Sequence, residues 1–387
     1  MLSNSRSVQK VITDGIDEII GVSVTMDVLL LSGNLVGGAA KVCCQLAKGL
    51  PRDITPTVAH LGGQNHFVDE LDDANIETVR LGWTELSIRS ARELDSLLRT
   101  GSFDLLHTHM LTGGLLGRPL GAAHGIPIVH TAHTNFSDRS AAARYLDLLS
   151  ATFVDRTICV SDAVAASLPR YYPTDIQTIH NCIDIHRHDS ATTEPNKPLD
   201  GIDIDQTAPI IANISRNDPV KRRVDLLEAF PRVLADYPSA RLVLTGRESE
   251  TRANLTPHAR RLGIQDSVHF VGYVSNIRRL NERANIMVFS SESEGFSISL
   301  LETMALGRPI VATEIAPFIE ALGENYPSTV PVRSPERLGQ EIVHVLSDSA
   351  YRERLRRYVL NRVERFASPN GAVSHARLYR QIVRSNS

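Results

Sequence analysis

The chain has 387 residues, of which 42% are hydrophobic and 22% charged. These values are typical of a globular protein with about two domains, and they exclude a fibrous repeat and a small disulfide-dependent fold. The net charge of -3 gives no general case for nucleic-acid binding. The charge is uneven, however: residues 1–185 carry a net charge of -6 and the remainder +3. An anionic ligand is therefore expected on the C-terminal half.

The N-terminus and the cysteines indicate a reducing compartment. The four cysteines form neither a CxxC pair nor a zinc-ligand spacing, so we expect free buried thiols. Residues 1–23 have no uninterrupted apolar stretch like that of a signal peptide, and we interpret them as a leader. No stretch approaches the roughly 20 apolar residues of a membrane span. We expect a cytoplasmic protein and leave open a peripheral contact with the inner membrane face.

Beyond the leader, short apolar stretches alternate with helical patterns. Such alternation is typical of a mostly parallel sheet covered by helices. It predicts a first domain over residues 24–185. The expected strands are 26–33, 54–62, 77–83, 103–109, 126–133, 156–161 and 176–181, with helices that include 37–50, 87–100 and 140–153.

Residues 186–208 are polar and interrupt this rhythm, which predicts a linker. The alternation then resumes in a second α/β domain over residues 209–370. Ligands of such sheets bind at the carboxyl ends of the strands, so the cleft between the two domains is the expected site. The expected strands are 209–216, 240–246, 267–272, 284–291, 308–313 and 328–333, with helices 222–237 and 297–307 and a mostly helical tail.

The clearest functional pattern lies between the strand at 284–291 and the next helix. Gly295 would let the backbone approach a ligand closely, with Glu294 on the ligand side of the turn. The helix start would offer an anion the backbone N–H groups of Phe296, Ser297 and Ile298. Glu302 lies in an otherwise apolar helix, where it either follows a solvated stripe or binds something specific.

A second pattern is basic. Arg216 ends an expected strand and Lys221 precedes an expected helix, so both would project from the carboxyl edge of the second sheet. Together they could neutralise a leaving diphosphate. The alternative is a solvated basic loop, which the neighbouring Arg222 and Arg223 make reasonable.

Gly37 and Gly38 open the first helix and permit a close backbone approach. They form neither a dinucleotide fingerprint nor a phosphate-binding loop, and the chain has no G-x-S-x-G motif. Four histidines lie at strand ends without HExxH spacing, so we expect no metal site. They are His107, His109, His130 and His133.

In chain order these features resemble those of retaining glycosyltransferases with the GT-B fold, most closely family four, also called group 1. The resemblance spans nearly the whole chain. The segments that carry it are Gly37-Gly38, HTAHT with His133, VSDAVAASL (160–168), HNCID (180–184), the Arg216 and Lys221 pair, GYV (272–274) and SEGFSISLLETMALGRPIVAT (293–313).

The resemblance implies two Rossmann-like domains facing each other across a cleft, with residues 371–387 as a helix that returns to the first domain. It implies that Arg216 and Lys221 contact the donor diphosphate, and that Glu302 binds the nucleotide ribose. It further implies that Glu294 binds sugar hydroxyls together with the backbone of residues 295–298. His133 would lie near the reacting sugar, and Gly37 and Gly38 near the diphosphate and the acceptor.

The implied function is retaining, metal-independent transfer of a sugar from a nucleotide-diphosphate sugar, without a further cofactor. The acceptor would be a glycan, a lipid-linked sugar or a small molecule. Two alternatives stay open: a nucleotide-sugar epimerase or phosphorylase on the same fold, and a non-catalytic nucleotide-sugar-binding homologue. The chain departs from the family pattern at Cys182, Arg222, Ser297 and Ala316-Pro317, where glycine is usual. The last of these changes puts the adjoining donor-side loop in doubt.

Overall fold

The structure is a computed structural model that describes residues 25–63, 65–82, 86–185, 204–205, 207–246, 248–272 and 278–386. The expected leader, most of the expected linker and the last two residues of the GYV motif lie outside these ranges. None of the helices within them is long and apolar enough to cross a membrane.

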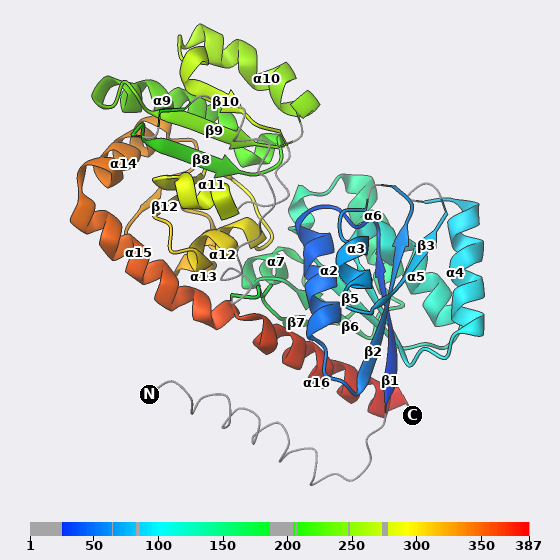
Figure 1. Cartoon of the computed structure of the whole chain (residues 1–387). Helices are drawn as coiled ribbons and strands as arrows, with labels where there is room; N and C mark the ends of the chain where they lie inside the picture. Colours follow the sequence, from blue (N-terminus) through cyan, green and yellow to red (C-terminus); the bar gives the residue numbers. More distant parts are fainter. Residues whose placement is uncertain are drawn as a thin grey trace, which may run out of the picture.

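The first domain is built on a seven-stranded sheet in which every pair of neighbouring strands is parallel (Figure 1). Its strand order is β3-β2-β1-β4-β5-β6-β7, so the chain crosses over between β3 and β4. Six of the seven predicted strands of this half contain an observed strand, and β7 begins one residue before the seventh. Their bounds are β1 (Met26–Ser32), β2 (Ile54–Leu61), β3 (Glu77–Leu81), β4 (Leu105–His109), β5 (Ile128–Ala132), β6 (Arg156–Cys159) and β7 (Asp175–Thr178).

The second domain holds a six-stranded parallel sheet in the order β10-β9-β8-β11-β12-β13. Each predicted strand of this half contains an observed strand that is shorter than predicted. The first strand of this domain ends at Ile214, and the last covers two residues only before the backbone turns at Arg333, whose φ is 55°. The bounds are β8 (Ile210–Ile214), β9 (Arg241–Thr245), β10 (Val268–Phe270), β11 (Ile286–Phe289), β12 (Ile310–Thr313) and β13 (Thr329–Val330).

Helices cover both faces of each sheet, as the fold class predicts. Alternate residues of β1 show why: Val28 and Leu30 belong to one buried apolar cluster, and Leu29 and Leu31 to another on the opposite face. The helices of the first domain are α2 (Gly37–Gly49), α3 (Val68–Asp72), α4 (Ile88–Thr100), α5 (Met110–Ala123), α6 (Ala141–Ala151) and α7 (Asp162–Ser167). Those that follow are α9 (Arg223–Asp236), α10 (Glu248–Arg261), α11 (Arg278–Arg283), α12 (Ile298–Ala305), α13 (Ala316–Leu322), α14 (Pro335–Ser347), α15 (Ser349–Val363) and α16 (Ser368–Asn386).

The last helix, α16, leaves the second domain and packs against α2 of the first (Figure 1, red). Tyr379 on α16 lies 2.6 Å from His107 on β4, and Arg380 donates to Asp53 at 2.6 Å. Helix α16 therefore links the second domain back to the first, and the carboxyl ends of β5 and β6 lie beside the loop that follows β11.

Candidate active site

The loop after β11 approaches the first domain most closely at Gly295. A Cβ added there would lie 1.9 Å from the carbonyl oxygen of His133, which follows β5. The sequence predicts that this glycine admits a ligand; in the structure its close neighbour is the backbone of the other domain. Glycine is required here because backbone leaves no room for a side chain, which brings His133 next to the turn that carries Glu294.

Three polar side chains of the first domain hold this loop by hydrogen bonds. Asn135 Nδ2 donates to the carbonyl of Glu294 at 3.2 Å, Ser161 Oγ to that of Gly295 at 2.8 Å, and Asn181 Nδ2 to that of Phe296 at 2.8 Å. The sequence alone did not point to a role for these three residues. All of them follow strands of the first sheet, and two lie within the quoted VSDAVAASL and HNCID segments, which was the available signal.

Lys221 and Glu294 form a nearly buried ion pair in the second domain. The Nζ of Lys221 lies 2.6 Å from Oε2 of Glu294, and the two side chains are 10% and 13% exposed. Ser291 Oγ donates to the other oxygen, Oε1, at 2.8 Å. Lys221 ends a short 3-10 turn (Pro219–Lys221), and its carbonyl accepts from Ser290 Oγ. The cation predicted for the diphosphate is thus already paired with the acid predicted for the sugar.

Arg216 lies in a different environment. It follows the end of β8 by two residues, its side chain is 76% exposed, and its nearest carboxylate is Asp218 at 3.7 Å. The structure therefore does not bring Arg216 into the buried pair of Lys221 and Glu294. Beneath this loop Arg223 donates to Ser215 and Asn213, and burial lowers its pKa to about 10. Arg223 is a structural support of the loop that carries Arg216.

The helix after the loop begins where the sequence predicts. Ser297 is the N-cap of α12, and its hydroxyl accepts from the backbone N–H of Leu300 at 3.3 Å. Ile298 is the first residue of the helix. The ring of Phe296 is buried and contacts Phe366, with ring centroids 5.2 Å apart, so this side chain belongs to the core.

Glu302 lies one turn further along α12 and is 8% exposed. Its Oε1 is paired with Nζ of Lys41, which lies on α2 of the other domain. The sequence did not predict this contact. Lys41 belongs to the first turns of α2, after Gly37 and Gly38, where a Cβ added to either glycine would have no described atom within 4 Å. Within the described chain no side chain caps this helix start, whose N–H groups suit an anion.

The strand-end histidines are mostly core residues. His107, His109 and His130 are at most 1% exposed, and burial lowers their pKa values well below the usual range. His133 lies at the edge of this cluster, with Nε2 3.0 Å from Nδ1 of His109. Burial, followed by the positive charge of Arg139, lowers the pKa of His133 to about 3. The imidazole of the residue facing Gly295 is therefore neutral at physiological pH.

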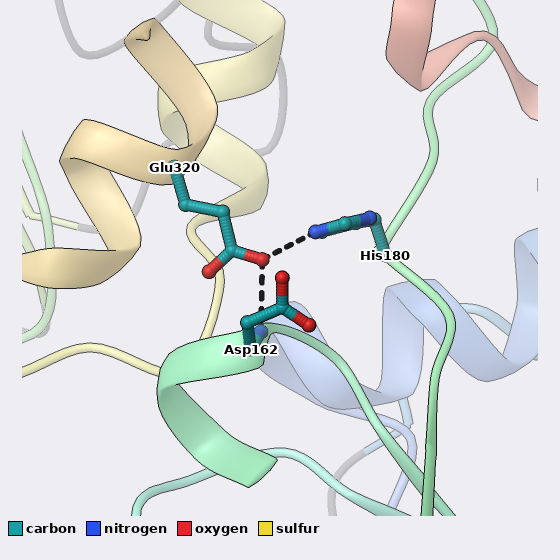
Figure 2. Close-up of side chains that lie close together, drawn as sticks. All are labelled: Asp162, His180 and Glu320. Carbon is teal, nitrogen blue, oxygen red and sulfur yellow. Dashed lines mark hydrogen bonds and ion pairs between the residues drawn. The ribbon is translucent and has the colours of Figure 1, made fainter. Parts of the chain in front are cut away.

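Figure 2 shows the described residues whose spacing would allow a metal ion, Asp162, His180 and Glu320. The carboxylate of Glu320, on α13, turns toward the His180 ring and the backbone of Asp162 at the start of α7. It accepts the N–H groups of Asp162 at 2.8 Å and of Ala163 at 3.5 Å. These bonds explain the cluster as a contact between the two domains, and we assign no metal to it.

Comparison with known proteins places this geometry in a family. Residues 199–362 match the family described as glycosyl transferases group 1, and residues 36–187 match glycosyltransferase family 4. An uncharacterised glycosyltransferase of Methanocaldococcus jannaschii is 24% identical over 86% of this chain and 90% of its own length. A D-inositol 3-phosphate glycosyltransferase of Catenulispora acidiphila is 27% identical, and the match spans 61% of this chain and 60% of that relative.

Solved structures share the whole architecture. HepE of Anabaena, in complex with UDP and glucose, is similar with a TM-score of 0.79 at 20% identity, covering 92% of this chain and 100% of that one. Sucrose-phosphate synthase from Thermosynechococcus elongatus gives a TM-score of 0.78 at 18% identity and covers 93% of this chain and 100% of that one. The two family matches, which follow one another along the chain and together span most of it, show with this two-domain fold that the chain belongs to family 4 (group 1) of the GT-B glycosyltransferases.

Proposed function

We propose that this glycosyltransferase moves a sugar from a nucleotide-diphosphate sugar to an acceptor, with retention of configuration and without a metal ion. The observation that carries the proposal is the nearly buried Lys221–Glu294 pair beside the neutral His133. Both groups of the pair are held in place by serine hydroxyl groups at the carboxyl edge of β11 and by the loop before α9.

The chemistry places opposite demands on the two ends of the donor. The leaving diphosphate gains negative charge, and fixed positive groups stabilise it in the transition state. Lys221 and the open start of α2 would supply this potential, with the exposed Arg216 closing on the phosphates. Glu294, once Lys221 turns toward the diphosphate, is free to accept hydrogen bonds from sugar hydroxyls. We assign no covalent nucleophile.

His133 would act as a neutral hydrogen-bonding group near the reacting sugar. Its lowered pKa keeps it uncharged, so it adds no charge that would compete with Lys221 for the diphosphate. The backbone of Gly295 fixes its position from the other domain. Through this contact, a shift of the loop on donor binding to the second domain would also move His133 on the acceptor side of the cleft.

The acceptor is proposed to be a glycan, a lipid-linked sugar or a small molecule. The relatives named D-inositol 3-phosphate glycosyltransferase and the structural neighbour named sucrose-phosphate synthase make phosphorylated polyols and sugars the first acceptors to screen. A lipid-linked acceptor would require peripheral contact with a membrane.

The test is a thermal-shift panel of UDP, GDP and ADP and their sugar derivatives, with and without divalent cations. Ligand binding to the folded state raises the unfolding temperature by mass action. A selective shift with one base, unchanged by chelator, followed by transfer of labelled sugar to an acceptor, would support the proposal. Turnover of the donor without an acceptor would favour an epimerase, a requirement for inorganic phosphate would favour a phosphorylase, and binding without turnover would favour a non-catalytic homologue.

A further inference from the structure

The ion pair between Lys41 and Glu302 joins α2 of the first domain to α12 of the second. The side chains of its two members differ in how far they can move. Glu302 is 8% exposed and fixed on a buried helix, whereas Lys41 is 31% exposed and carries its charge on a flexible four-carbon stem. The side chain of Lys41 is therefore the one that can move out of the ion pair with little loss of free energy.

Glu302 is also the residue that the family resemblance assigns to the nucleotide ribose. A vicinal diol is best held by both oxygens of a carboxylate, and Lys41 already occupies Oε1. The second oxygen, Oε2, has no hydrogen-bond partner among the residues that the structure describes. A ribose hydroxyl group that approaches Oε1 therefore competes with the ammonium group of Lys41 for the same carboxylate oxygen.

The position of Lys41 on its helix indicates where it would go. It lies three and four residues after Gly38 and Gly37, and residues at this spacing share one face of a helix. A lysine released from Glu302 would thus stand over the open start of α2, where the diphosphate is expected. The first turn of this helix contains no acidic residue that would hold the lysine instead.

We propose that Lys41 is a specificity and positioning residue that reports occupancy of the ribose site: it pairs with Glu302 in the empty enzyme, is displaced by the ribose, and then neutralises the donor diphosphate. The inference rests on the proposed donor site. In this scheme the enzyme favours ligands that carry both a ribose and a diphosphate, because only these offset the loss of the ion pair.

Lys41→Met tests the scheme, and Lys48→Met is its matched control. Lys48 lies on the same helix and pairs with Glu70 within the first domain, with a similar exposure of 25%. Affinities are measured for UDP, GDP and ADP by calorimetry, and for uridine, guanosine and adenosine by competition against the diphosphate that binds. Each measurement is repeated in the Glu302→Gln background.

We expect Lys41→Met to bind the nucleoside about two- to fivefold more tightly, the range that a partly exposed ion pair contributes. In Lys41→Met, the ratio of nucleoside-diphosphate affinity to nucleoside affinity should fall about fivefold or more. Lys48→Met should change neither the nucleoside affinity nor this ratio. In the Glu302→Gln background the gain in nucleoside affinity should vanish. If Lys41→Met binds nucleoside equally or less well, the proposed displacement is wrong while the donor site stands. If the wild type binds neither nucleosides nor diphosphates, the proposed function fails as well.

Discussion

Replacing Lys221 with alanine removes the cation that the structure places deepest in the candidate site. The loss of one fixed group that stabilises a developing oxyanion costs on the order of 3 kcal/mol in the transition state. We therefore expect the rate of sugar transfer to fall about a hundredfold. The same change leaves the carboxylate of Glu294, 13% exposed, without its partner at 2.6 Å. Breaking a fully buried pair costs roughly 3–5 kcal/mol of folding free energy, so a smaller loss is expected for this slightly exposed pair.

Two measurements separate these effects. Transfer of labelled sugar gives kcat and KM for the donor, and urea unfolding gives the free energy of unfolding. Lys221→Met combined with Glu294→Gln removes both charges and should recover most of the stability while transfer stays lost. Lys48→Ala, which breaks an ion pair away from the candidate site, should leave transfer unchanged. A folded Lys221→Ala enzyme with more than a third of the wild-type transfer rate would refute the role given to this residue.

Three further predictions concern the domain contacts and the buried histidines. Gly295→Ala should lower the unfolding temperature and the transfer rate, because its Cβ would lie 1.9 Å from the carbonyl oxygen of His133. Gly38→Ala, in open space within α2, should keep the unfolding temperature or raise it slightly. Equal unfolding temperatures for the two variants would contradict the packing argument. Tyr379→Phe removes the hydroxyl bonded to buried His107 and should cost about 1–3 kcal/mol, with faster proteolysis of α16; unaltered urea unfolding would count against that bond. Burial lowers the pKa of His375 to about 4, and burial also holds the pKa of His107 well below its usual range. Because the folded-state pKa of His375 is depressed, the free energy of unfolding declines as pH falls from about 6.5 toward 4, by about 1.4 kcal/mol per pH unit. His107 changes the free energy of unfolding in the same direction. Unfolding free energies at pH 7.5, 6.5 and 5.5 should show this decline, and equal values would exclude it.

The parallel sheets could be predicted because their strands are short apolar stretches with turn residues at both ends, and burial on two faces makes that pattern nearly continuous. Helix α5 shows the limit of local patterns. It contains four glycines and Pro119, which disfavour a helix in isolation. The packing explains it: a Cβ at Gly117 would lie 2.7 Å from the side chains of both Leu31 and Thr108. The glycines let the helix lie close to the sheet, and tertiary contact outweighs propensity.

Some contacts of the candidate site could likewise be predicted from the sequence, and others could not. Lys221 and Glu294 lie close together because each follows a strand of one sheet, which order along the chain can suggest. The contact of Lys41 with Glu302 joins residues 261 positions apart on different domains, and no local pattern encodes it. Phe296, grouped with the donor-binding residues by its position at the helix start, has its ring in the core. A helix start fixes where backbone N–H groups point, but not where each side chain goes.

The contacts between the domains suggest how the site is kept in register. Asn135, Ser161 and Asn181 each donate to a backbone carbonyl of the loop that carries Glu294, and His133 is held against the same loop at Gly295. These hydrogen bonds depend on the position of the loop backbone and not on which side chains the loop carries. A change in the loop that preserves the path should therefore be tolerated, while one that shifts it should move Glu294 and His133 together. The geometry of the site then depends on how the two domains meet, and Gly295 is one of the points where they touch.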